Sequence, residues 1–238
     1  MKNADYLNDR SEPLYVIHFP GSGLEEYLEL AESNVTRSIT ISSKISIISI
    51  MNAACIDKSI LKRQCDNNEI RIYNTAESER DWSNTLKIKH IIKCLDMIST
   101  KYALIIDGRD TVLTHDLDDG FIEKWMSFKK GVVYNGTPKA FPEAAVEPLQ
   151  ELLQIRGKQK FLNAGVCFGE VNILRSFYKK CEEVLRANPN TNSEQIIVRI
   201  ARQYMKDYIG IDHNNDLFRI CHTYDTAIKE EADNIILI

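Results

Sequence analysis

Strand-type and helix-type segments alternate along most of this 238-residue chain, and the alternation limits the folds open to it. Apolar, β-branched runs predict strands, and apolar residues at helical spacing predict helices between them. Predicted strands lie at residues 45–51, 70–73, 102–107, 131–134 and 161–168, and predicted helices at 84–99, 172–187 and 193–208. Such alternation predicts an α/β layer fold with a mostly parallel central sheet.

The first forty residues are harder to interpret. Residues 14–19 read as an extra strand and residues 24–32 as a helix, ahead of the main alternation. No repeat, low-complexity tract or Gly/Ser linker interrupts the rest of the chain, and a hydrophobic share of 44% supports a substantial core. We therefore expect an N-terminal extension of unknown role (residues 1–40) followed by a single domain (residues 41–238).

Composition argues against several classes of protein. The net charge of −4, with Lys and Arg spread along the chain, argues against a nucleic acid partner. The six cysteines have neither metal-ligand spacing nor the density of a secreted disulfide scaffold, so reduced thiols are expected. We see no apolar stretch of about 18 residues and no signal peptide pattern. A cytoplasmic protein without a transmembrane segment is the expectation.

The segment YALIIDGRDTV (residues 102–112) carries the clearest chemical signal. Its apolar run predicts a buried strand, and open α/β sheets bind their ligands at the carboxyl ends of strands. Asp107 and Asp110 follow that end and predict a site for a hard divalent cation. A strand followed by an Asp-containing turn is the alternative. The later acids of THDLDDG are interpreted as a turn and a helix start.

Four segments, taken in order, resemble one family of enzymes. They are IDGRDTV (106–112), VVYNGTPKAFP (132–142), FLNAGVCFG (161–169), and SEQ (193–195) followed by IDH (211–213) and LF (217–218). Together they resemble the glycosyltransferase domain of procollagen lysyl hydroxylases and related nucleotide-sugar transferases of the GT-A fold. The resemblance covers roughly residues 45 to 220. It implies a GT-A-like fold with three α/β/α layers around a mostly parallel sheet.

The resemblance also implies a metal site and a donor. Asp107 and Asp110 match the family's acidic motif, which holds Mn²⁺ or Mg²⁺ against the phosphates of a nucleoside diphosphate sugar, here expected to be a UDP-sugar. Family members commonly add a histidine near the C-terminal end of the domain. His222 is the candidate here, although the family's His- and Gly-rich loop is missing, and a structural histidine is the alternative.

Further site residues follow from the resemblance. Asn163 and Gly165 are expected to line the sugar pocket, with close packing around a strand glycine as the alternative. Lys87 and Gln195 are expected to contact the donor, although a solvated helix-face lysine is an equal reading of Lys87. Glu194 is expected to be the catalytic acid–base or cation-stabilising residue, and helix capping competes with that role.

The chain departs from the family in several places. Ala164 replaces a usual Ser, Thr137 replaces an acid, and Glu194 stands where Asp is usual. His213 is interpreted as a hydrogen-bonded structural histidine.

The sequence thus predicts a hexosyltransferase whose acceptor hydroxyl, on a glycan, a protein or a small molecule, and whose stereochemistry stay open. A degenerate nucleotide-sugar-binding domain without turnover is the alternative. A haloacid-dehalogenase-type phosphatase fits less well, because its two acids need one intervening residue and this motif has two.

Overall fold

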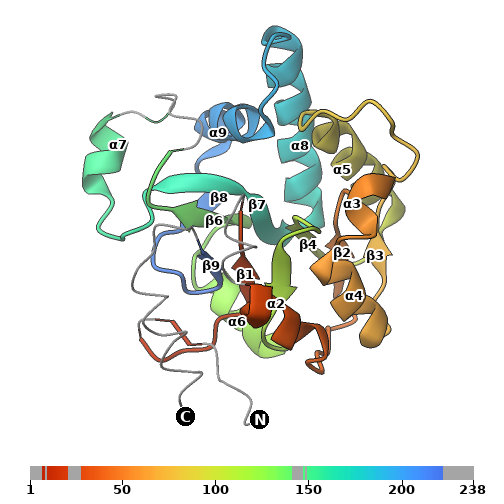
Figure 1. Ribbon diagram of the computed structural model, residues 1–238. Coiled ribbons are helices and arrows are strands. Elements are labelled where there is room, and N and C mark those ends of the chain that lie inside the picture. The colour runs from red at the N-terminus through yellow and green to blue at the C-terminus, as the bar shows by residue number, and fades with distance from the viewer. Residues whose placement is uncertain (1–6, 9, 21–27, 141–146, 148, 222–238) are drawn as a thin grey trace.

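The computed structural model describes residues 7–8, 10–20, 28–140, 147 and 149–221 (Figure 1). Within these ranges the central sheet has the strand order β3-β2-β4-β7-β6-β8. Only β7 runs against the others, since it pairs antiparallel with both β4 and β6. The strands are β2 (Ile45–Ile48), β3 (Ile72–Tyr73), β4 (Tyr102–Ile106), β6 (Val132–Thr137), β7 (Phe161–Glu170) and β8 (Ile209–Asp212).

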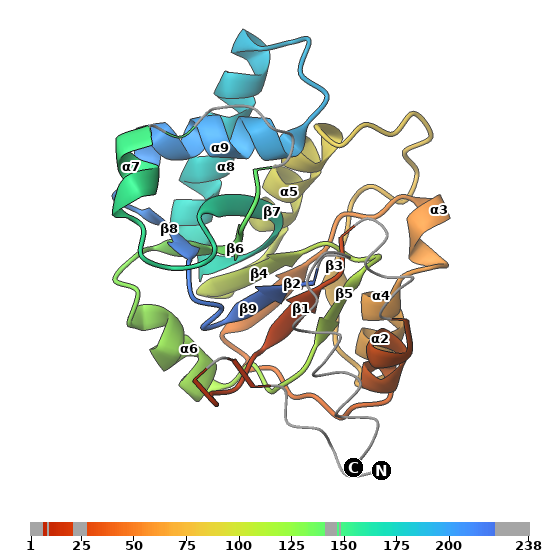
Figure 2. The same ribbon diagram turned by 60° about the vertical axis from the view of Figure 1, so that its left-hand side comes forward.

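Helices cover both faces of this sheet (Figures 1 and 2). One face packs against α5 (Leu86–Met97), α8 (Val171–Ala187) and α9 (Glu194–Met205) in a continuous apolar cluster. The other face packs against α4 (Ile60–Asn67), α6 (Asp119–Met126) and a second, smaller sheet. Three layers around a mostly parallel sheet confirm the predicted α/β fold class.

The smaller sheet contains β1 (Val16–His18) between β5 (Thr111–Leu113) and β9 (Phe218–Ile220). β1 is antiparallel to β5 and parallel to β9. The extra strand predicted near residues 14–19 is therefore confirmed. Its outer side packs against α2 (Leu28–Val35) and α4 through a third apolar cluster. The first half of the helix predicted at residues 24–32 lies outside the described residues.

Local sequence accounts for where several helices begin. Asp118 caps α6 by accepting a hydrogen bond from Phe121 N–H at 3.0 Å, as the reading of THDLDDG predicts. Ser193 caps α9 in the same way. α5 begins without such a cap, because Thr85 occupies its N-cap position and makes no side-chain cap bond. Two further short helices are α3 (Ala53–Ile56) and α7 (Leu149–Gln154).

Two sequence-based expectations concern the whole chain. All six cysteines are free thiols, as expected. Among the helices in the described ranges, none combines the length and apolar character needed to cross a bilayer.

Candidate functional site

The two acids of the DGRD turn lie at the carboxyl end of β4, beside the helices of one face. Asp107 directly follows β4, and Asp110 directly precedes β5. Gly108 fits between them because a Cβ at this position would lie 2.1 Å from Met51 Sδ and 2.6 Å from Ser49 Oγ. The Ser59 hydroxyl donates to the Gly108 carbonyl and fixes the turn. The backbone thus presents both carboxylates at one edge of the sheet, as the sequence predicts.

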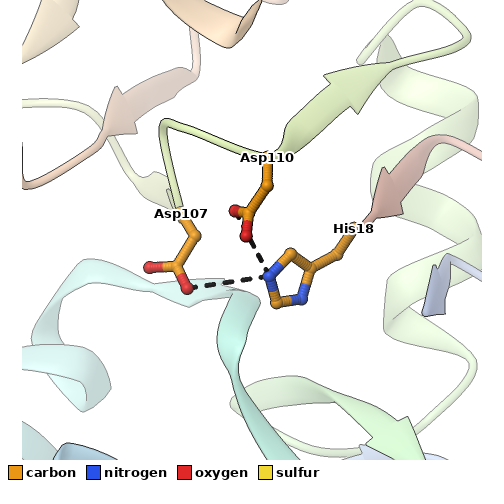
Figure 3. Close-up of side chains that lie close together, drawn as sticks. All are labelled: His18, Asp107 and Asp110. Atoms are coloured by element: carbon orange, nitrogen blue, oxygen red, sulfur yellow. Dashed lines mark ion pairs between the residues drawn. The ribbon is translucent and has the colours of Figure 1, made fainter. Parts of the chain in front are cut away.

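His18 completes a cluster with these two acids (Figure 3). Its Nε2 lies 3.7 Å from Asp107 Oδ2 and 3.5 Å from Asp110 Oδ1. The imidazole is 3% exposed, whereas the carboxylates of Asp107 and Asp110 are 30% and 18% exposed. A buried nitrogen therefore faces two partly exposed carboxylates.

Lys87 of α5 and Glu194 of α9 lie next to Asp107, on the face of the sheet that these two helices cover. Lys87 Nζ lies 2.5 Å from Asp107 Oδ1 and 3.4 Å from Glu194 Oε2. Glu194 opens α9 but does not cap it, since Ser193 does so. Glu194 is the acid of the first turn of α9, where the helix dipole favours it, and its 7% exposed side chain also reaches Lys87.

These groups shift one another's protonation. Burial raises the pKa of Glu194 to about 7, against the opposing pull of Lys87. Burial lowers the pKa of His18, but the carboxylates of Asp110 and Asp107 outweigh it and the net pKa is raised. Burial likewise raises the pKa of Asp110, yet His18 and Lys87 bring it below its ordinary value. The cluster is a set of coupled charges in a desolvated place, which is typical of functional sites.

A break in the sheet ladder brings β7 into the cluster. Tyr134 pairs with Cys167, but the next residue of β6, Asn135, pairs with Asn163. The intervening residues of β7 bulge toward β4, where Asp107 N–H donates to the Gly165 carbonyl at 2.7 Å. The Asn163 side chain accepts from Gly165 N–H at 2.9 Å. Asn163 and Gly165 thus lie beside the acids, and their role in lining a sugar pocket stays a prediction.

Gln195 is placed differently from the other predicted donor residues. Its Oε1 accepts from Ala164 N–H at 2.7 Å, and its Nε2 donates to the Leu162 carbonyl. Both ends of the amide are therefore bound to the backbone of β7. Gln195 ties α9 to the bulge, so that Glu194 and Asn163 are held at fixed positions relative to each other.

Other predicted residues lie away from the cluster or outside the description. His213 Nδ1 contacts the Gln159 carbonyl at 2.5 Å, as expected of a structural histidine. Asp212 is buried and accepts backbone N–H bonds from Asp216, Leu217 and Phe218, which closes the β8–β9 loop. His222, the predicted third metal ligand, lies outside the described residues.

His18 is the site residue that sequence reasoning missed. It ends an apolar run, residues 14–18 (LYVIH), just as Asp107 ends the run of β4. A polar, metal-ligating side chain at the end of a buried strand was the available signal. Its partner strand, β5, was not predicted, and without that pairing the histidine had no visible link to the acids.

The donor set fits a divalent cation. One atom each from His18, Asp107 and Asp110 lie within 4.8 Å of one another. Two atoms about 2.1 Å from a shared ion lie about 3 Å apart at a right angle and about 4.2 Å apart when opposite each other. The observed separations of 3.5 and 3.7 Å fall inside this range.

Comparisons with known proteins do not show a family for this chain. No protein-family model matches the chain, and no curated protein matches it. Among solved structures, 2-C-methyl-D-erythritol 4-phosphate cytidylyltransferase from Thermus thermophilus is 12% identical, with a TM-score of 0.38, covering 79% of this chain and 98% of its own. The 4-diphosphocytidyl-2C-methyl-D-erythritol synthase from Anaerococcus prevotii is also 12% identical at a TM-score of 0.38, covering 91% and 93%. Likeness this distant says nothing about the reaction, and the resemblance to lysyl hydroxylases stays a prediction.

Proposed function

We propose that this protein is a metal-dependent transferase that moves a hexose from a nucleoside diphosphate sugar to an acceptor hydroxyl. The observation that carries the proposal is the cluster at the carboxyl end of β4. There Asp107 and Asp110 come within reach of one cation, and Glu194 lies behind them through Lys87. The preferred donor, by the family resemblance, is a UDP-sugar.

The charges of the cluster suit a diphosphate leaving group. The carboxylates of Asp107 and Glu194 already engage the ammonium of Lys87, so this lysine is not free to neutralise a phosphate. A bound Mn²⁺ or Mg²⁺ would supply the positive charge that stabilises the departing diphosphate. Asp107 and Asp110 would hold that ion, while Lys87 fixes the Asp107 carboxylate through its Oδ1.

Glu194 is the group we assign to proton transfer. With a pKa of about 7 it carries a proton in part of the population at neutral pH, which suits a base that takes a proton from an acceptor hydroxyl. Asn163 is the group we assign to the sugar. Its Oδ1 is oriented by Gly165 N–H, and its amide nitrogen can donate to a hydroxyl of the hexose.

The test is donor binding and donor breakdown by the purified protein. Thermal unfolding would be followed with UDP-, GDP- and CDP-sugars, each with Mn²⁺ or with chelator, and released nucleoside diphosphate would then be measured by phosphorus NMR. We expect a Mn²⁺-dependent stabilisation by one nucleotide class and slow release of its diphosphate. Glu194→Gln should keep the stabilisation and slow the release by about 100-fold or more.

The other outcomes separate the alternatives. Binding without any release, even with a panel of hydroxyl acceptors, would favour the degenerate binding domain. No stabilisation by any nucleotide would remove the proposal. Asp119→Asn serves as the control, because this exposed acid pairs with Lys44 at the start of α6 and should behave as wild type.

A further inference from the structure

We infer that His18 is the third protein ligand of the cation held by Asp107 and Asp110, so that β1 supplies a nitrogen donor to the site. For the presence of a cation the inference rests on the proposed function. Beyond that function, the inference names the third protein ligand and the class of metal that this ligand favours. The separations within the cluster, the position that the backbone gives the ring and the burial of the ring all support this role.

The separations are long for a charge-assisted hydrogen bond and fit two ligands of a shared ion. A charge-assisted N–H···O bond is about 2.7–2.9 Å long. Nε2 of His18 lies at 3.5 Å from Asp110 and 3.7 Å from Asp107, with nearly the same gap to both (Figure 3). A nitrogen set back equally from two carboxylates leaves the space that a cation of coordinating radius about 2.1 Å needs.

Backbone hydrogen bonds on both sides of β1 fix where the ring lies. His18 is in register with Thr111 of β5, and the Phe19 N–H donates to the Asp110 carbonyl at 2.8 Å. On the other side, Cys221 N–H donates to the His18 carbonyl at 2.8 Å. The strand that carries the histidine is thus bonded directly to the residue that carries one of the carboxylates.

The ring itself is held from the β7 side. A Cβ on Gly165 would lie 2.2 Å from Cε1 and 2.6 Å from Nδ1 of His18, so only glycine leaves room for the imidazole. The His18 side chain is only 3% exposed, and its Nδ1 has no hydrogen-bond partner among the described residues. A buried imidazole nitrogen without a partner costs free energy, and coordination to a cation would satisfy Nε2, the nitrogen that faces the two carboxylates.

A nitrogen ligand has a consequence for the choice of metal. Carboxylate oxygens alone suit Mg²⁺, Ca²⁺ and Mn²⁺, whereas imidazole favours transition metals. A site of one imidazole and two carboxylates should therefore bind Mn²⁺ or Co²⁺ more tightly than Ca²⁺. Removal of the imidazole should reduce this preference together with the affinity.

The experiment uses the full chain with Mn²⁺ alone. Pulsed electron paramagnetic resonance detects nitrogen hyperfine coupling when an imidazole binds Mn²⁺, and calorimetry gives the affinity. We expect nitrogen coupling in the wild type, its loss in His18→Gln, and an affinity lower by about tenfold or more in that variant. His222→Gln and His115→Gln should keep both the coupling and the affinity. Gly165→Ala, which pushes the ring aside, should weaken the coupling without removing any ligand.

Contrary results are equally specific. Absence of nitrogen coupling in the wild type with bound Mn²⁺ would overturn the inference. So would coupling that persists in His18→Gln or disappears in His222→Gln. If His18→Gln does not fold, as judged by its thermal unfolding with chelator, the wild type and Gly165→Ala decide the matter. A protein that binds Mn²⁺ through His18 but no nucleotide would keep this inference and remove the proposed function.

Discussion

At the scale of single residues, Asp107 contacts both Lys87 and His18 and so links the two parts of the candidate site. Its Oδ1 contacts Lys87 at 2.5 Å and its Oδ2 faces His18 at 3.7 Å. One carboxylate therefore connects the side that we assign to proton transfer with the side that we assign to the metal. Because the lysine holds one oxygen, the other keeps a fixed direction without help from the cation.

Asp110→Asn tests the metal side of the candidate site. Asparagine keeps the shape of the side chain but removes the charge, so the fold should remain and the affinity for Mn²⁺ should fall by at least about tenfold. Titration calorimetry measures the affinity, and thermal unfolding with chelator checks the fold. Wild-type Mn²⁺ affinity in Asp110→Asn would exclude this carboxylate from the site.

Glu194 gives the stability a pH dependence that can be predicted with its sign. Its pKa is about 7 in the folded protein, against an ordinary value of 4.5. Between these values the folded state binds more protons than the unfolded state, so the free energy of unfolding falls as the pH rises. Glu194→Gln should remove a fall on the order of 3 kcal/mol between about pH 4.5 and 7, with chelator present.

Urea unfolding at a series of pH values measures this difference. Glu123→Gln is the matched control, since this glutamate is exposed on α6. Parallel pH profiles for the wild type and Glu194→Gln would mean that Glu194 is not held in a desolvated place.

At the scale of elements, α9 and β7 act as one unit through Gln195. The two amide contacts to Ala164 N–H and the Leu162 carbonyl satisfy backbone groups at the bulge. Gln195→Ala should lower the free energy of unfolding by about 1 to 3 kcal/mol, because both backbone groups lose their partner. Gln203→Ala on the same helix is the control, since the Gln203 Nε2 has no partner among the described residues. Equal stabilities of the two variants in urea would contradict the account.

Most elements of the central domain could be predicted from the sequence, because their apolar periodicity is strong. The apolar runs that precede Ser49 and Asp107 form β2 and β4. The apolar residues at helical spacing that precede Thr100 form α5. What the sequence did not show was the direction of β7 and the bulge within it. Pairing direction and register depend on neighbours that are distant in the sequence, and periodicity within a strand does not encode them.

At the scale of the whole molecule, the segment around β1 (residues 14–19) belongs to the core. Leu14, Val16, Ile17 and Phe19 are all at most 3% exposed, and β1 is the middle strand of the smaller sheet. Burial of each such side chain contributes about 1.5–3 kcal/mol. Their sum is a large share of the ~5–15 kcal/mol that keeps a domain folded.

A chain shortened to residues 41–238 should therefore not fold cooperatively. Circular dichroism during urea unfolding would show a broad, early transition or none. A sharp transition close to that of the full chain would mean that residues 1–40 are a dispensable extension.

The candidate site was predictable where its residues follow one another along the chain. Asp107 and Asp110 share one turn, and Glu194 opens a helix whose start the sequence marks with Ser193. His18 lies 89 residues before Asp107 in the sequence (107 − 18 = 89). The pairing of β1 with β5 brings the two together, and the sequence pattern does not specify that pairing. The resemblance predicts His222, which lies outside the described residues, because it follows the family's chain order and carries no information on this chain's second sheet.

Calorimetric titration of the protein with UDP, once with Mn²⁺ and once with chelator, tests whether Asp107 and Asp110 bind a nucleotide through a metal ion. We expect binding with Mn²⁺, none with chelator, and none in Asp110→Asn under either condition. Binding that ignores both the metal and Asp110, or no binding of UDP and of the other nucleoside diphosphates, would contradict this expectation.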